Sequence, residues 1–225
     1  MENHNNEGLA VNHENRLCVN RPYYVIADKG SGEIVEKKSR FIANLAPVES
    51  EEDALRFIEE VKKKYWDARH NCWAYIIGRQ GQLVRASDDG EPQGTAGRPI
   101  LEVLGGSNLT NVVAVVTRYF GGVLLGTGGL VRAYTQAAQE AVRSSVIIQM
   151  RYGNQLTVTI DYPDVGKLQY WLGQRAIPVL RSQYEVRAQM DIMIPFEDTE
   201  EVIKDIAEAT MGRALVSITD SRYYS

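Results

Sequence analysis

The sequence predicts an α+β protein with two domains, and three observations support that prediction. An apolar, β-branched run at 112–116 is short enough to be a buried strand, and it leads through a glycine-rich segment into a helical pattern. Past Arg151 a second series of segments begins, in the order β-α-β-β-α-β. The 225 residues are enough for two small cores. We expect a disordered polar leader at 1–20, a first domain at 21–148 and a second at 152–225.

The first domain is predicted to contain two hairpins and a capped helix before the apolar run. Its expected strands are 23–27, 33–45, 71–78 and 83–87, with a glycine turn at 28–32. Ser50 has the position of a helix N-cap, with Asp53 as its capping-box partner, and the helix should run to about Tyr65. Residues 88–99 are too rich in glycine and proline for regular structure, and a short helix should follow at 100–104.

The stretch Val112–Tyr134 is predicted to form a strand, a glycine-rich loop and a helix that runs to about Ser145. Five glycines lie between Gly121 and Gly129, directly before the 3.6-residue apolar pattern. Such a loop directs unpaired backbone N–H groups and the positive end of a helix dipole at one point, which suits a phosphate. Tight turning and close helix–sheet packing explain the glycines equally well.

The second domain is predicted to be ferredoxin-like, because that is the fold of the β-α-β-β-α-β order. Its expected strands are 154–162, 179–187, 188–195 and 214–219, and its expected helices are 163–174 and 199–211. Pro163 occupies the favoured first position of its helix, and Gly212 stops the last helix. We expect residues 149–153 to form the linker between the domains.

Composition and charge exclude several classes of protein. The net charge is −4, with 17 Lys and Arg against 18 Asp and Glu in 1–150, and 8 against 11 in 151–225. Such a chain does not coat nucleic acid non-specifically, although a local basic groove is compatible with it. Cys18 and Cys72 indicate no disulfide framework and fit a reducing cytoplasm. No apolar run reaches the roughly 20 residues that span a membrane, and the first residues lack a signal-peptide core.

Basic residues scattered along the first domain form the candidate anion-binding site, together with the glycine-rich loop. The set is Arg40, Arg69, His70, Arg98, Arg118 and Arg132 with Gly121, Gly122, Gly126, Thr127, Gly128 and Gly129. If the sheet gathers them near Trp73 and Tyr119, they make a phosphate-tracking surface with stacking faces. The alternative is that these side chains only solvate strand edges.

Metal and cofactor motifs are sparse. Asp88, Asp89 and Glu91 could hold a divalent cation, although local turn hydrogen bonds explain them as well. His70 and Cys72 are too few for a zinc site, and His70 could be a general acid–base or a strand cap. The glycine loop matches neither a phosphate-binding P-loop nor a dinucleotide fingerprint, so we expect no cofactor.

Several linked motifs across residues 20–150 resemble the IMPACT-like family of the bacterial YigZ type. They are KSRFIA at 38–43, DARHNCWAY at 67–75, SDDGEP at 87–92, GTAGRP at 94–99, RYFGG at 118–122 and LGTGGLVRAY at 125–134. The tail from 151 fits the smaller second domain of bacterial members, whereas the leader to about Arg21 matches nothing in the family motif.

The resemblance implies two folds. The first is that of the second domain of small-ribosomal-subunit protein five, which is also domain IV of elongation factor G. The other is the ferredoxin-like domain V of that factor. For bacterial members the resemblance implies binding to nucleic acid, either ribosomal or transfer RNA, and it assigns no catalytic residues. Eukaryotic members act in translational control through a partner protein. They carry a different accessory domain, so we do not transfer that partner to this chain.

We therefore expect a cytoplasmic, non-catalytic protein that binds RNA or associates with the ribosome and modulates translation. One alternative is an enzyme on a small phosphorylated or nucleotide substrate, by analogy with small-molecule kinases, with Mg²⁺ at the three carboxylates. Another is a protein–protein adaptor whose ferredoxin-like domain docks a protein partner in translation through its sheet.

Overall fold

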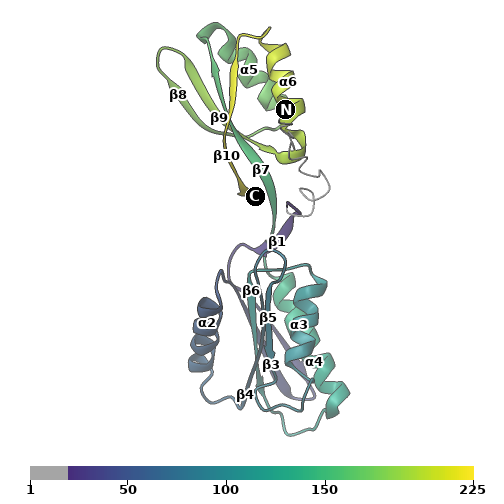
Figure 1. Ribbon diagram of the computed structural model, residues 1–225. Helices are drawn as coiled ribbons and strands as arrows, with labels where there is room; N and C mark the ends of the chain where they lie inside the picture. Colours follow the sequence, from purple (N-terminus) through teal and green to yellow (C-terminus); the bar gives the residue numbers. More distant parts are fainter. Residues whose placement is uncertain (1–19) are drawn as a thin grey trace, which may run out of the picture. The chain divides into compact units, whose positions relative to one another are not determined.

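The computed structural model describes residues 20–225, which divide into two units. The first unit contains residues 23–149, and the second contains residues 20–22 and 150–225. Each unit is an α+β domain (Figure 1). The leader expected at 1–20 lies almost entirely outside the described residues. Within residues 20–225, no helix combines the length and apolarity needed to cross a membrane.

The first unit is a five-stranded antiparallel sheet with helices on both faces (Figure 1). The strands of this sheet are β2 (Gly30–Glu36), β3 (Ser39–Pro47), β4 (His70–Ile77), β5 (Leu83–Ser87) and β6 (Val112–Tyr119). A further strand, β1 (Tyr23–Ile26), lies next to β7 (Ile147–Ile160) in the second sheet. The helices of the first unit are α2 (Glu51–Lys64), α3 (Gly97–Gly106) and α4 (Gly126–Arg143). The strand order is β2-β3-β6-β4-β5, with α2 packed on one face and α3 and α4 on the other.

The predicted apolar run is the central strand β6, and it contributes to a core on each face. Val112, Ala114 and Val116 pack in the core beneath α3 and α4, whereas Val113 and Val115 pack beneath α2. All five are fully buried. Successive side chains of a strand point to opposite faces, so a strand covered on both sides must be apolar at every position.

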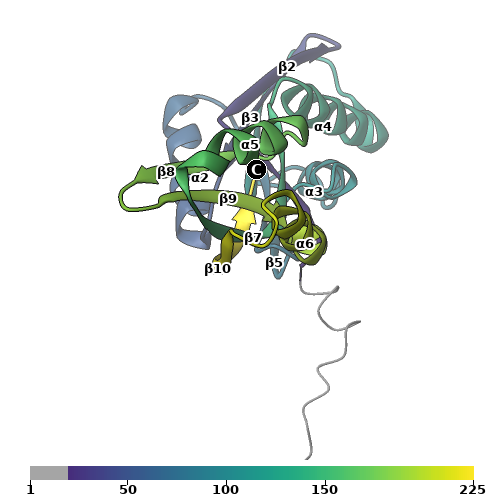
Figure 2. The same cartoon turned by 90° about the horizontal axis from the view of Figure 1, so that it is seen from above.

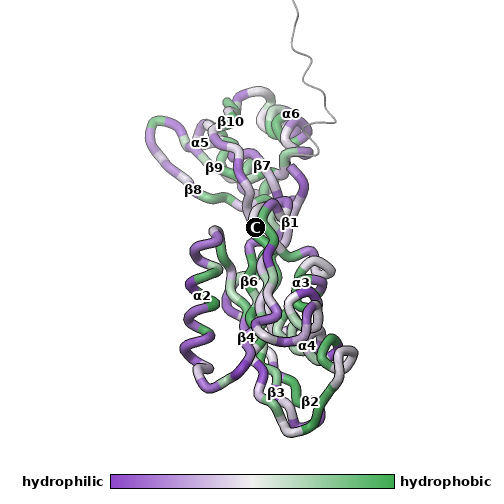
Figure 3. The backbone as a smooth tube through the Cα atoms, turned by 60° about the horizontal axis from the view of Figure 1, so that its bottom comes forward, coloured by the Kyte–Doolittle hydropathy of each residue, from purple (hydrophilic) through white to green (hydrophobic). Residues whose placement is uncertain are grey.

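The prediction for α2 is confirmed at its start and along its length. Ser50 Oγ accepts a hydrogen bond from the backbone N–H of Asp53 at 3.1 Å. Hydrophilic and hydrophobic residues alternate along the helix at the spacing that turns one stripe inward (Figure 3). Phe57 and Val61 belong to this buried stripe and pack on the sheet.

Three boundaries in the first unit differ from the prediction. The β2–β3 hairpin turns at Lys37 and Lys38, whose φ angles are 47° and 66°, and not at 28–32. Turns with positive φ angles usually contain Gly, Asn or Asp, so a pair of lysines did not predict a turn at this position. α3 and α4 begin at Gly97 and Gly126, ahead of the expected starts. The backbone N–H groups in the first turn of a helix have no acceptor within that helix, so glycine and proline are tolerated there.

The second unit is ferredoxin-like, as its element order predicted. It contains β7 (Ile147–Ile160, whose first residues belong to the first unit), α5 (Tyr162–Gln174), β8 (Val179–Tyr184), β9 (Ala188–Pro195), a 3₁₀ turn (Phe196–Asp198), α6 (Thr199–Ala209) and β10 (Leu215–Tyr224). The strand order is β10-β7-β9-β8, and β8 and β9 run side by side as a hairpin (Figure 2). The division between the units falls after Gln149, within the linker expected at 149–153. These residues form part of β7, however, and Gly153 pairs with Arg222 of β10.

Candidate functional site

One end of the first unit's sheet, where β6 ends and β4 begins, carries several of the predicted site residues. The register places Arg118 of β6 opposite Phe41 on one side and opposite His70 on the other. Arg118 and His70 therefore lie side by side on the face that α3 and α4 cover. Arg40 is opposite Tyr119, one residue further along, so these two side chains belong to the other face.

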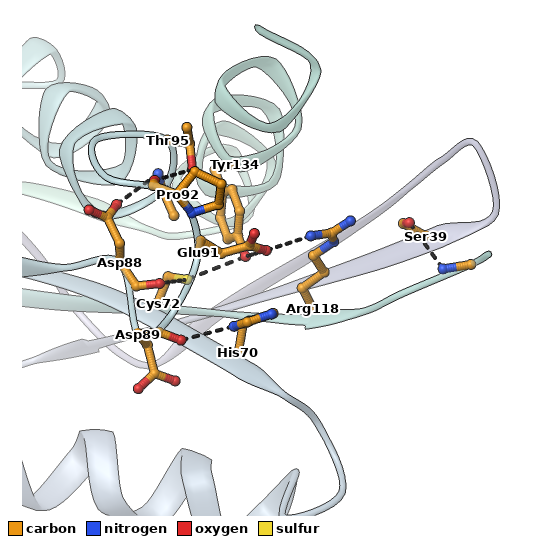
Figure 4. Close-up of polar contacts among 12 residues, drawn as sticks. Ser39, His70, Cys72, Asp88, Asp89, Glu91, Pro92, Thr95, Arg118 and Tyr134 are labelled. Carbon is orange, nitrogen blue, oxygen red and sulfur yellow. Dashed lines mark hydrogen bonds and ion pairs between the residues drawn. The ribbon is translucent and has the colours of Figure 1, made fainter. Parts of the chain in front are cut away.

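Arg118 is buried at this end of the sheet in an ion pair with Glu91. The Nη1–Oε1 distance is 2.6 Å, and the two side chains are only 9% and 3% exposed. The hydroxyl of Tyr134 on α4 donates to the same Glu91 oxygen at 2.9 Å (Figure 4). Glu91 thus ties the loop before α3 to both β6 and α4. A carboxylate held in this way by two donors serves as an internal anchor of the domain.

Asp88 anchors the same loop from its other end. Its carboxylate accepts hydrogen bonds from the backbone N–H groups of Gly94, Ala96 and Gly97, at 2.8, 3.0 and 2.9 Å. Burial by itself would raise the pKa of Asp88, but these three hydrogen bonds outweigh it and hold the pKa below its ordinary value. Asp88 therefore stays ionised and closes the turn at the start of α3.

The predicted divalent-cation site does not assemble. Asp89 accepts from the backbone N–H of Asn71 at 2.7 Å, and its other oxygen is 3.8 Å from Lys62 Nζ. Asp88, Asp89 and Glu91 thus meet three separate sets of partners. Throughout the described residues, no group of three or more His, Cys, Asp or Glu side chains is placed to hold a metal ion. His70 Nδ1 is 2.9 Å from the backbone oxygen of Asp89, a contact that fits a structural histidine (Figure 4).

Cys72 lies beneath this network and is fully buried. Its thiol contacts the backbone oxygen of Asp88 at 2.9 Å and the Tyr134 hydroxyl at 3.3 Å. Burial is the main cause that raises the pKa of the Cys72 thiol and also that of Tyr134. Both groups therefore remain protonated in the folded domain at any physiological pH.

We predict that Cys72 is inert toward thiol reagents until the first unit unfolds. The reactive species is the thiolate, which burial suppresses, and the reagent cannot reach a covered sulfur. In a Cys18→Ser chain at pH 8, iodoacetamide should modify Cys72 in urea within minutes. In buffer it should do so at least 100-fold more slowly. Rapid modification of the folded chain would show that this region opens to solvent.

The loop from Phe120 to Leu125 and the first turn of α4 form an exposed surface at the same sheet end. Gly121 packs on the β2–β3 turn, where its backbone N–H donates to Ser39 Oγ at 3.1 Å. From Gly122 to Gly128 every residue except Leu125 is exposed, and Leu125 is half-buried. Phe120 is 52% exposed. This loop is therefore open to solvent, as a loop that binds an anion must be.

α4 begins without the groups that usually satisfy a helix N-terminus. No side chain caps it, and its first turn contains no acidic residue. Arg132 is exposed, and its Nη1 lies 3.9 Å from the position that a Cβ on Gly128 would take. The arginine therefore reaches back along the helix toward the first turn. Free N–H groups and a guanidinium at one place form an environment for an anion.

The six predicted basic residues do not form one continuous anion-binding surface. Arg40 is bound by both oxygens of Glu33, at 2.5 and 2.8 Å, and that contact is also the main reason why the pKa of Glu33 is lowered. Arg98 pairs with Glu102 on α3 at 2.8 Å. Arg69 and Arg132 are exposed and make no ion pair with residues 20–225. Of the six predicted basic residues, these two remain available to a ligand.

Sequence reasoning counted Lys37 and Lys38 among the basic residues of this surface, but it missed the turn that they form and the contact that Tyr134 makes. The two lysines had been placed on a strand, but they form an exposed turn that packs against Gly121. Their positive φ angles carried no signal in the residue types. Tyr134 was predicted to be on the buried face of its helix, and that pattern gave no sign that its hydroxyl would meet Glu91, 43 residues earlier in the chain.

Comparisons with known proteins agree with this architecture. Residues 37–142 match the Impact N-terminal domain, and residues 158–213 match a domain of unknown function, DUF1949. The IMPACT family member YvyE of Bacillus subtilis (strain 168) is 37% identical over 192 residues, covering 85% of this chain and 88% of YvyE. The IMPACT family member YigZ of Escherichia coli (strain K12) is 37% identical over 178 residues, covering 78% of this chain and 87% of YigZ.

A solved structure described as that of a hypothetical protein shares the fold. It is 33% identical, with a TM-score of 0.57, and the match covers 88% of this chain and 98% of the other. Relatives at this level of identity, matched over most of their length, show that the chain belongs to the IMPACT family.

Proposed function

We propose that this protein binds RNA, free or in the ribosome, through the sheet end of its first unit, and that it acts in translation in the cytoplasm. The proposed surface consists of four exposed basic residues, Lys37, Lys38, Arg69 and Arg132, with the loop 120–125 and the first turn of α4. The observation that carries the proposal is the uncapped, acid-free start of α4 with Arg132 beside it. Backbone N–H groups and guanidinium groups are the donors that hold phosphates.

Two further features support RNA over a small phosphorylated substrate. None of the four basic side chains forms an ion pair with residues 20–225, so their charges are available to a polyanion. Phe120 and Trp66 are 52% and 82% exposed, and exposed aromatic rings provide stacking faces for unpaired bases. The α+β folds of the two domains, which resemble domains IV and V of elongation factor G, favour a role in translation.

We predict that Arg132→Glu weakens RNA binding at least tenfold, the effect of losing one charge-assisted contact. Fluorescence anisotropy with a labelled transfer RNA and with a labelled single-stranded RNA measures the affinity over a series of salt concentrations. The slope of log affinity against log salt should fall by about one for each phosphate contact removed. Adding Lys38→Glu should lower affinity and slope further.

Arg143→Glu is the matched control, because it makes the same charge change at the opposite end of α4, where Arg143 is paired with Glu140. It should leave RNA affinity within about threefold of the parent chain. Arg118→Ala is unsuitable as a test, since it breaks the buried pair with Glu91. Equal affinity for Arg132→Glu and Arg143→Glu variants would remove the sheet end as the RNA-binding surface.

A further inference from the structure

A cleft between α2 and the β2–β3 edge of the sheet has the features of a small-molecule site. Its volume is about 300 Å³, at the lower end of the range for ligand pockets. The start of β2, the second half of β3 and the inner side of α2 line it. We propose that this cleft binds a small organic anion built on an aromatic ring. The proposal does not rest on RNA binding, because no residue of the sheet-end surface lines the cleft.

The first observation is an unsatisfied donor in the cleft. Asn44 of β3 lines the cavity, and its Nδ2 is buried without a hydrogen-bond partner among the described residues. Asn44 lies opposite Val115, whose side chain belongs to the apolar core beneath α2. An amide kept without a partner beside such a core destabilises the fold, so its presence there calls for an acceptor. A ligand carbonyl, ring nitrogen or acidic oxygen would supply one.

The charges around the cleft indicate that the ligand also carries an anionic group. Lys29, the residue before β2, and Lys64, the last residue of α2, both line the cleft and are exposed. Glu60 is 3.5 Å from Lys29 and neutralises it in part, whereas Lys64 makes no ion pair within residues 20–225. Two lysines and one glutamate give the lining a net charge of +1. A ligand with a single anionic group complements that charge.

The remaining lining is apolar and includes one aromatic ring. Phe57 and Val61 of α2 line the cleft and are almost fully buried, whereas the Leu45 side chain belongs to the core beneath α3 and α4. The ammonium of Lys29 lies over the Phe57 ring, 5.2 Å from its centroid, so charge and aromatic surface meet at this point. The larger cavity of the second unit, about 540 Å³, makes a weaker case, because its Arg175 is already paired with Asp205 at 2.7 Å.

The first test uses matched pairs of charged and neutral rings on the full ¹⁵N-labelled chain. The probes are AMP with adenosine and nicotinate with nicotinamide, and inorganic phosphate and acetate serve as anions without a ring. We expect at least one charged ring to shift the Asn44 side-chain NH₂ resonances with a Kd below about 1 mM, and its neutral partner to bind at least tenfold more weakly. If no charged ring moves those resonances, or phosphate alone moves them equally, the proposal is wrong.

The second test separates binding from packing. Asn44→Leu removes the unsatisfied amide and keeps a side chain of similar volume, so it should raise Tm by roughly 4 °C. In this variant the charged probe should no longer shift the backbone resonances of α2 residues. Lys64→Gln should weaken the charged probe at least tenfold without lowering Tm. Lys63→Gln, a neighbouring exposed lysine that does not line the cleft, should bind like the parent chain. Unchanged probe affinity in both the Asn44→Leu and Lys64→Gln variants would overturn the site.

Discussion

Replacing Glu91 with alanine should destabilise the first unit by about 3–5 kcal/mol, the largest effect of any substitution considered for this protein. The change leaves the Arg118 guanidinium buried without its counter-ion, and it removes the acceptor of the Tyr134 hydroxyl. Arg118 Nε already lacks a hydrogen-bond partner among residues 20–225, so no neighbouring group is placed to take over. Most domains have only 5–15 kcal/mol of net stability, so this loss removes a large part of it.

Urea unfolding followed by tryptophan fluorescence measures this effect. Trp66 and Trp73 lie in the first unit and Trp171 in the second, so a Trp171→Phe background makes the signal report the first unit alone. Glu102→Ala is the matched control, since it breaks an exposed glutamate–arginine pair on α3 and should change stability by less than about 0.5 kcal/mol. A Glu91→Ala change below about 1 kcal/mol would contradict the anchoring role.

A double variant sharpens the interpretation. Glu91→Leu combined with Arg118→Met removes both charges and keeps an apolar filling, so it should recover much of the stability lost by Glu91→Ala. The difference between the Glu91→Leu single variant and this double variant measures the penalty of leaving the Arg118 charge buried without a partner. A double variant as unstable as the single one would mean that the loop before α3 depends on the carboxylate for its hydrogen bonds and not for its charge.

Replacing Gly121 with alanine should destabilise the first unit by about 2–3 kcal/mol and displace the loop that it begins. A Cβ at this position would lie 2.0 Å from the carbonyl carbon of Lys38 and 2.4 Å from the backbone nitrogen of Ser39. Both obstacles are backbone atoms, so no side-chain rotation can relieve them. The β2–β3 turn and the β6–α4 loop must separate instead, with loss of the Gly121–Ser39 hydrogen bond.

Gly128→Ala is the control for Gly121→Ala, and the two substitutions should have opposite signs. Gly128 lies in the first turn of α4, with only the end of the Arg132 side chain within 4 Å of a new Cβ. Alanine favours a helix over glycine by up to about 1 kcal/mol, so this variant should be neutral or slightly more stable. The same urea experiment compares both. Equal stabilities for the two variants would show that the backbone around Lys38 and Ser39 can move to accommodate a Cβ at position 121 at little cost in free energy.

Several parts of the fold could be predicted because their signals are local. The Ser50 cap lies next to the helix that it begins, and the apolar stripe of α2 repeats within that helix. The run at 112–116 contains no polar residue, which is the pattern of a strand covered on both faces, and it is the central strand of the sheet. The β-α-β-β-α-β order of the second unit needs only the sequence of elements along the chain.

The candidate site was predicted less well, because its chemistry depends on pairs of residues far apart in the chain. Arg118 was expected to face a ligand, but it is paired with Glu91, 27 residues earlier. Arg40 and Arg98 looked equally available, yet each has an acidic partner on the neighbouring strand or the same helix. No residue type in the sequence distinguishes a paired arginine from a free one.

The sequence by itself determined the family, the two-domain α+β class and the glycine-rich entry to α4, because periodicity, caps and motifs act over a few residues. Only the tertiary structure decided which charges are anchors and which are exposed. Antiparallel register placed Arg118 between Phe41 and His70 on the face that α3 and α4 cover, and it put Arg40 on the face that α2 covers. Register is fixed by the combined packing of all strands and helices, so a one-residue shift would exchange those roles.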